Sequence, residues 1–175
     1  MKSSPSLKPQ DVVILLKLAL SPDRSFTYAE LASELKMSPS EVHDGLKRAH
    51  LAGLVDESKR KVFRQALLEF LVYGLRYVFP ASPGKIVKGL PTAHSAQPLA
   101  SHIRSSGDEF VWPDPHGKAK GQEIPPLYRS VPEAARKDSK LYEILSLIDA
   151  LRVGRAREKS FAKQEIELRL MGVSA

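Results

Sequence analysis

The pattern of apolar and polar residues predicts three helices in the first third of the chain. Residues 12–20 are nearly all apolar and follow Pro9, which is typical of a helix with proline in its first turn and buried on several sides. Two capping boxes follow, Thr27–Glu30 and Ser38–Glu41, in which a hydroxyl and a carboxylate satisfy the amides at a helix start. They predict two short helices joined by a tight turn, and Gly53 ends the second.

The rest of the chain predicts helices on both sides of an irregular segment. Apolar residues between Phe63 and Val78 recur with the helical period, which indicates a helix over about 60–79. Residues 80–132 hold nine of the thirteen prolines and half of the ten glycines. Within them, residues 109–112 and 122–124 predict a small β-hairpin, with Trp112 as an anchor onto a helix. Asp138 then predicts the start of a helix that ends near Gly154, and a charged helix over 155–171 follows.

These elements predict a mainly α fold in three parts. Residues 1–79 form an N-terminal domain of packed helices. Residues 80–132 form a connecting region, rich in proline and glycine, with a short β-hairpin. Residues 133–175 form a C-terminal helical pair that serves dimerisation or partner binding.

Composition narrows the classes of function. The chain has no cysteine, which excludes disulfides and thiolate metal sites, and no apolar run long enough for a membrane-spanning helix. The polar start, Met1–Pro5, leads into no signal-type segment, so we expect a cytoplasmic protein. The net charge of +7 favours an anionic partner such as nucleic acid, although residues 1–60 carry 9 basic and 8 acidic side chains. The charge excess is equally compatible with a role in solubility alone.

Residues 27–55 resemble the helix-turn-helix of winged-helix bacterial transcriptional regulators, with the MarR-like group closest. The matching positions are Leu31, Ala32, Leu35, Ser38, Val42, Leu46 and Ala52-Gly53-Leu54-Val55. The resemblance covers residues 8–78 and implies that the second helix of the motif lies in a DNA major groove. Lys36 departs from the pattern, since glycine is common there. Only seven residues separate Val55 from Phe63, which predicts a vestigial wing rather than two full strands.

The candidate DNA-binding residues lie on the second helix of the motif, at the helix starts and in the short wing. On a helical wheel, five polar residues point away from the apolar stripe Val42/Leu46/Ala49. Lysine and arginine donate to guanine, and aspartate accepts from cytosine. The complete candidate set is Thr27, Ser38, Ser40, His43, Asp44, Lys47, Arg48, Lys59, Arg60 and Lys61. The alternative for this face is an ordinary solvated helix surface.

The sequence therefore predicts a regulator that binds double-stranded DNA sequence-specifically, most simply a repressor acting as a homodimer on a palindrome. The expected dimer elements are the helix over 60–79 and the C-terminal pair, with Leu67, Leu71, Leu75, Leu145 and Ile148 as buried positions. For each of these residues, packing within the single chain is an equally open alternative. The alternative is an antitoxin-like interaction module that binds a cognate toxin and uses the helix-turn-helix as a scaffold. Asp114 and His116 lack a third ligand at diagnostic spacing, so we expect no metal, no cofactor and no enzymatic activity.

Overall fold

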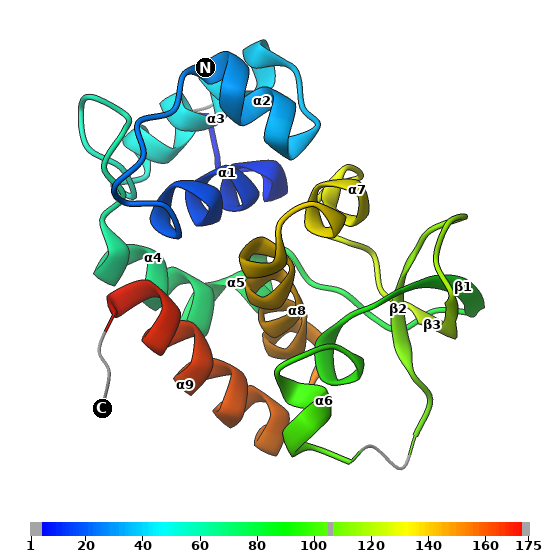
Figure 1. The fold of residues 1–175 in the computed structure, drawn as a ribbon. Coiled ribbons are helices and arrows are strands. Elements are labelled where there is room, and N and C mark those ends of the chain that lie inside the picture. The colour runs from blue at the N-terminus through cyan, green and yellow to red at the C-terminus, as the bar shows by residue number, and fades with distance from the viewer. Residues whose placement is uncertain (1–4, 105–106, 173–175) are drawn as a thin grey trace.

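The computed structural model describes residues 5–104 and 107–172, which form a mainly helical fold, as predicted, together with a small three-stranded sheet (Figure 1). The elements in chain order are α1 (Pro9–Ala19), α2 (Tyr28–Leu35), α3 (Pro39–Leu51), α4 (Arg64–Glu69), the π-helical turn η1 (Phe70–Gly74), α5 (Leu75–Val78), β1 (Ile86–Pro91), the 3-10 turn η2 (Ala93–Ser95), α6 (Leu99–His102), β2 (Phe110–Pro113), β3 (Ala119–Glu123), α7 (Val131–Arg136), α8 (Ser139–Val153) and α9 (Ala156–Met171).

Both predicted capping boxes are confirmed. The Thr27 hydroxyl accepts from the Glu30 amide at 3.1 Å, and the Glu30 carboxylate accepts from the Thr27 amide at 2.7 Å. In α3 the corresponding distances between Ser38 and Glu41 are 3.2 and 2.8 Å. Residues 12–16 of α1 are completely buried, and both α2 and α3 pack against this helix. The three predicted helices of the first third are therefore present.

The predicted tight turn after α3 is also present. A single antiparallel bridge joins Val55 to Val62. The Asp56 carboxylate accepts from the amides of Lys61 and Arg60, at 3.0 and 3.1 Å, and from the Ser58 hydroxyl. These hydrogen bonds, that of Lys61 first, lower the pKa of Asp56 to about 2. The turn is held by this carboxylate and by two backbone hydrogen bonds beside the bridge, from the Asp56 amide to the Lys61 carbonyl and from the Phe63 amide to the Leu54 carbonyl, both at 2.9 Å.

The helix expected over 60–79 differs from the prediction in two ways. It begins at Arg64 because the preceding residues pair with the other side of the turn, so Phe63 is 45% exposed. The wide π-helical turn η1 adds a residue to one turn and rotates the positions that follow it. Val78, which the regular period places inside, is accordingly 54% exposed.

The β-hairpin prediction is wrong. β2 and β3 pair in parallel, with Phe110 opposite Gln122, because each also pairs antiparallel with β1. Both strands thus run opposite to β1 and in the same direction as each other, and the three close on themselves. Strand β1 was not predicted, because the residues of β1, IVKGLP, lack a regular alternation of apolar and polar positions and include both glycine and proline.

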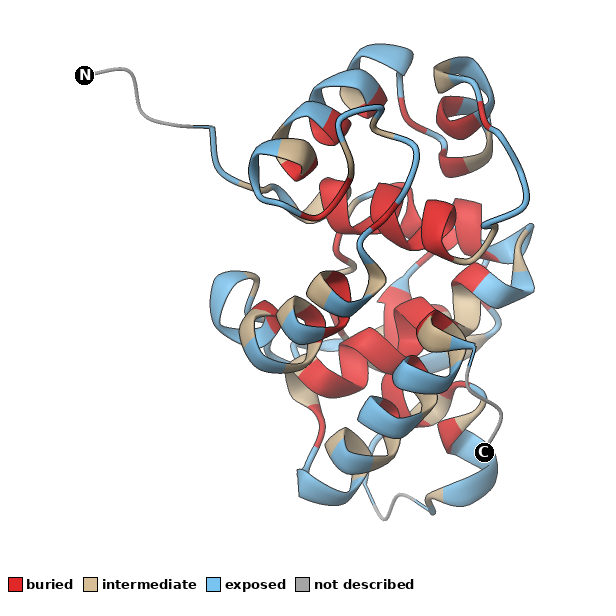
Figure 2. Ribbon diagram, turned by 90° about the vertical axis from the view of Figure 1, so that its left-hand side faces the viewer, coloured by how far each residue is buried: buried red, intermediate tan, exposed pale blue. Residues whose placement is uncertain are grey.

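The C-terminal helical pair is confirmed, and α8 lies at the centre of the molecule. Asp138 caps α8 by accepting from the Leu141 amide at 3.1 Å. Within α8, the buried Asp149 carboxylate accepts from the Trp112 indole at 2.6 Å and from the Thr92 hydroxyl at 2.7 Å. Trp112 therefore does anchor the middle segment onto a helix. Figure 2 shows the buried residues concentrated along the central helices, with exposed residues towards the outside.

The five apolar residues expected at a dimer interface are buried within the single chain. Leu67, Leu71, Leu75, Leu145 and Ile148 are each at most 1% exposed. They belong to one core cluster that runs from α1 to α9. Their burial is confirmed, but it comes from packing of the α4–α5 segment on α8 and α9 of the same chain, so these five side chains are not available to a dimer interface, and the dimer itself stays a prediction.

Candidate nucleic-acid interface

Helix α3 is buried along one side and exposed along the other. Val42 and Ala49 are completely buried and Leu46 is 1% exposed, so the apolar side of α3 is fixed to the core. The opposite side presents four of the predicted residues to solvent, Ser40, His43, Asp44 and Lys47. A helix held in this way can offer its polar side to a groove without moving.

The segment after β3 reaches the start of α3 but does not cover this exposed side. The Tyr128 hydroxyl donates to the Glu41 carboxylate, and the Ser130 hydroxyl donates to the Leu35 carbonyl at 2.7 Å. Arg129 is 3.6 Å from Glu41 and its side chain is 80% exposed. The N-terminal end of α3 is therefore bordered by an exposed arginine from a distant part of the chain.

Arg48 does not lie on the exposed side, contrary to the helical-wheel prediction. Its guanidinium donates twice to the completely buried Asp11 of α1, at 2.8 Å each, and its side chain is only 12% exposed. Hydrogen bonding to Asp11 outweighs the cost of burial and raises the pKa of Arg48. The close approach of the two helices explains the pairing, since a Cβ on Gly45 would lie 2.8 Å from an Asp11 oxygen. Arg48 holds α3 against α1 and is not free to contact DNA.

Two predicted residues, Thr27 and Ser38, are exposed and serve as helix caps. Their hydroxyl oxygens already accept backbone amides, so each retains only its hydroxyl proton for a ligand. Around them, the Asp44 carboxylate accepts from His43 Nδ1 at 3.1 Å, and the His43 ring lies edge-on to Tyr28, with ring centroids 5.8 Å apart. Lys47 has no side-chain partner among the described residues, which leaves its ammonium available.

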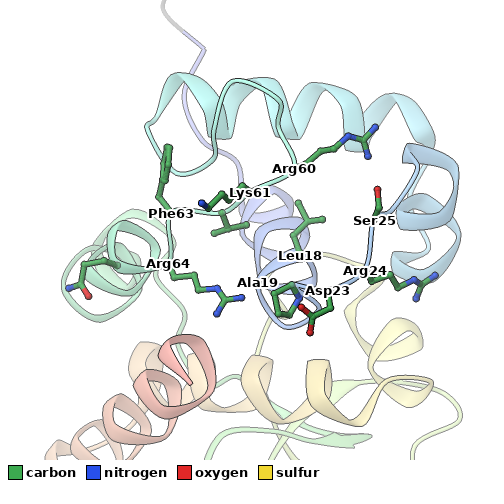
Figure 3. Close-up of a pocket in the computed structure, with 12 residues that line it drawn as sticks. Leu18, Ala19, Asp23, Arg24, Ser25, Arg60, Lys61, Phe63 and Arg64 are labelled. Atoms are coloured by element: carbon green, nitrogen blue, oxygen red, sulfur yellow. The ribbon is translucent and has the colours of Figure 1, made fainter. Parts of the chain in front are cut away.

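The basic residues of the turn border a cleft rather than extending α3. A cleft of about 760 Å³ separates the end of α1 from the turn and the start of α4 (Figure 3). Lys61 and Arg60 line it, together with Arg64. The Arg60 guanidinium donates to the Phe26 carbonyl at 2.6 Å, and Lys59 is half-buried with φ of 59°. Of the three predicted basic residues, only Lys61 is both exposed and without a side-chain partner in the described chain.

Sequence reasoning missed Tyr128 and Arg129 at this site. They lie 87 and 88 positions after Glu41, and no spacing pattern links two segments so far apart. It also missed the partner of Arg48, because polar residues on a helical wheel are assigned to the outside by default.

The other candidate chemistry gives no site. Asp114 is paired with Arg136 and also accepts from the His116 amide at 2.9 Å, so it caps a turn and balances a charge. Across residues 5–104 and 107–172, no group of three or more His, Asp or Glu side chains is arranged to hold a metal ion. No helix in that same part of the chain is long and apolar enough to cross a membrane.

Comparison of the chain with protein-family models, with curated proteins and with solved structures finds no match.

Proposed function

We propose that this protein is a cytoplasmic transcriptional regulator, acting as a repressor, that binds double-stranded DNA through the exposed side of α3. The observation that carries the proposal is the division of α3 into a completely buried apolar side and an exposed side with Ser40, His43, Asp44 and Lys47. In this interpretation α1, α2 and α3 form a winged-helix-like domain, and the Val55–Val62 turn is its vestigial wing.

Each exposed group has a defined role in this proposal. Lys47 and His43 donate to base edges or phosphates, and Asp44 accepts from a cytosine amino group. Lys61 and Arg129 contact phosphates on either side of α3. Arg48 acts indirectly, because its ion pair with Asp11 fixes the orientation of α3 against α1.

The proposed repressor binds a palindrome as a homodimer, since α3 alone offers few base contacts. The interface must use residues that the core leaves exposed. On the η1–α5 segment, Tyr73, Tyr77 and Val78 are 66%, 73% and 54% exposed. Light scattering at micromolar concentration is expected to give the mass of two chains, and the double variant Tyr73→Glu/Tyr77→Glu the mass of one.

The proposal is tested by the DNA affinity of Lys47→Ala over a range of salt concentrations. Fluorescence anisotropy with a duplex from the region upstream of its own gene is expected to show weaker binding by the variant. The slope of log affinity against log salt should fall by about 0.9 for each phosphate that the variant no longer neutralises. Lys159→Ala is the matched control, because Lys159 lies on α9, a helix far from α3 in Figure 1, and its side chain has no partner among the described residues. Equal affinity and slope for Lys47→Ala and the wild type would overturn the assignment of α3.

A second candidate is the antitoxin-like interaction module. The specific observation in its favour is that the pairing of Arg48 with Asp11 leaves Lys47 as the one lysine or arginine among the predicted α3 residues that is exposed. It predicts that the wild-type protein has no measurable affinity for the upstream duplex even at low salt, which the same titration detects.

A further inference from the structure

Two lysines face each other across the small sheet. Lys88 of β1 and Lys120 of β3 are direct partners in the antiparallel register, and both are exposed. Directly opposite residues project from the same face of a sheet, and like charges in that position destabilise the pairing. The Lys88–Lys120 pair is thus unfavourable, whereas an acidic residue at either position would give a favourable pair.

The charge around this pair is not compensated by the protein. Lys85 and Lys118 lie beside the two strands and are also exposed. None of the four lysines makes an ion pair or a side-chain hydrogen bond with any described residue. Asp114, the acid closest in sequence to Lys118, is paired with Arg136. We refer to Lys85, Lys88, Lys118 and Lys120 as the lysine patch.

Protection of a sheet edge does not explain Lys88. Lysine is common on edge strands, where it prevents pairing with other chains. Here β1 pairs with a strand on each side, and the three strands close on themselves. Lys88 therefore occupies the strand with neighbours on both sides, where edge protection has no role.

The lysine patch is linked to α3 by a short segment with fixed contacts. Arg129 lies nine positions after Lys120, a stretch that spans at most about 32 Å even when fully extended. Arg129 and Tyr128 contact Glu41 in the first turn of α3. One turn of duplex DNA is about 34 Å long. The segment from Lys120 to Arg129 is therefore no longer than about one helical turn of duplex DNA, and it ends beside the first turn of α3.

We propose that the lysine patch is a second DNA contact surface, which binds backbone phosphates of the same duplex that α3 reads. This inference rests on the proposed function. A phosphate placed between Lys88 and Lys120 removes their mutual repulsion, so binding stabilises a pair that is unfavourable in the free protein. The contact adds affinity and fixes the direction of the duplex but reads no bases.

The test is the variant Lys120→Glu, which converts the like-charged pair into an opposite-charged one. Without DNA, its Tm is expected to rise by about 1–3 °C, because the repulsion becomes an attraction. Its affinity for the upstream duplex is expected to fall severalfold, and its salt slope to decrease by about 0.9 or more. A residue with a purely structural role would not give higher stability together with weaker binding.

Two reference variants separate the possible outcomes. Lys159→Glu makes the same change in net charge on α9, at a lysine without a side-chain partner among the described residues, so it measures the general electrostatic effect. If Lys120→Glu binds DNA as tightly as Lys159→Glu, the inference is wrong, and an acidic protein becomes the better partner for the patch. If Lys47→Ala still weakens binding in that case, the proposed function stands alone, whereas a wild-type protein without DNA affinity overturns both.

Discussion

At the scale of single residues, the pair formed by Asp11 and Arg48 controls the position of α3. Asp11 is completely buried, and both of its oxygens accept from the Arg48 guanidinium at 2.8 Å. One Asp11 oxygen also accepts the Lys8 amide at 2.9 Å, so the same carboxylate caps α1. A charged group in the core is tolerated only when its hydrogen bonds are satisfied, and here they are.

Removal of the carboxylate should be strongly destabilising. Asp11→Ala leaves the largely buried guanidinium without a partner, and we expect a loss of about 3–5 kcal/mol in the free energy of unfolding. Urea denaturation followed by circular dichroism measures it. Asp44→Ala is the control, since Asp44 is exposed and its loss should cost less than about 0.5 kcal/mol. The double variant Asp11→Leu/Arg48→Met should recover much of the loss, and a loss equal to that of the single variant would contradict the charge argument.

At the scale of elements, the turn between α2 and α3 contains a local strain. Lys36 ends α2 with φ of 56° and ψ of 44°, in the left-handed region that favours glycine. This is the position at which helix-turn-helix motifs often have glycine, so the departure visible in the sequence has a structural cost. The Met37 amide still donates to the Ala32 carbonyl at 2.9 Å, which keeps the turn closed.

Lys36→Gly is therefore expected to stabilise the protein. Relief of the left-handed strain outweighs the additional entropy of glycine in the unfolded chain, for a gain of about 0.5–1 kcal/mol. Lys36→Ala is the matched control, because it also removes the 3.9 Å ion pair with Glu133 but keeps the strained φ. In thermal melts, Lys36→Gly should have a higher melting temperature than Lys36→Ala. Equal melting temperatures would show that the turn is not strained.

At the scale of the whole molecule, an ion network joins the N-terminal helices to α8. The ammonium of Lys17 in α1 lies 2.7 Å from Glu34 in α2 and 2.5 Å from Asp138 at the start of α8. Burial opposes ionisation of both carboxylates, but hydrogen bonds from Lys17 outweigh it, so the pKa of Glu34 and that of Asp138 lie below their usual values. Burial also opposes the charge of Lys17, but its hydrogen bonds to the two carboxylates outweigh this and raise its pKa.

This network predicts how stability depends on pH. Because the two carboxyl pKa values are lower in the folded state, the unfolded chain binds more protons in acid, and stability falls as the pH drops from about 5 through the folded values. Lys17→Met should cost about 2 kcal/mol at pH 7 and less at pH 4, because there the carboxylates of the unfolded chain and of the variant take up protons while those paired with Lys17 stay ionised. Thermal melts between pH 4 and 7 measure both effects. Lys140→Met, at an exposed lysine of α8, should keep the wild-type pH profile. A Lys17→Met deficit that stays constant with pH would exclude this mechanism.

The structural features that could be predicted from the sequence are those that depend on contacts between residues close together in the chain. The capping boxes at Thr27 and Ser38, the start of α8 at Asp138 and the tight turn at Asp56 each involve partners within five positions. Such contacts form wherever the segment is helical or turned, so residue type and spacing are enough to predict them. The exposed side of α3 was predictable for the same reason, apart from Arg48.

Contacts between segments far apart in the chain could not be predicted from local patterns and are known from the tertiary structure alone. The antiparallel pairing of β1 with both other strands makes β2 and β3 parallel, and no pattern within those strands encodes a partner strand. The Arg48–Asp11 pair spans 37 positions and the Tyr128–Glu41 contact spans 87. A charged residue at such a contact can be buried instead of exposed, because a carboxylate from a distant segment pairs with the arginine and offsets the cost of removing its charge from water.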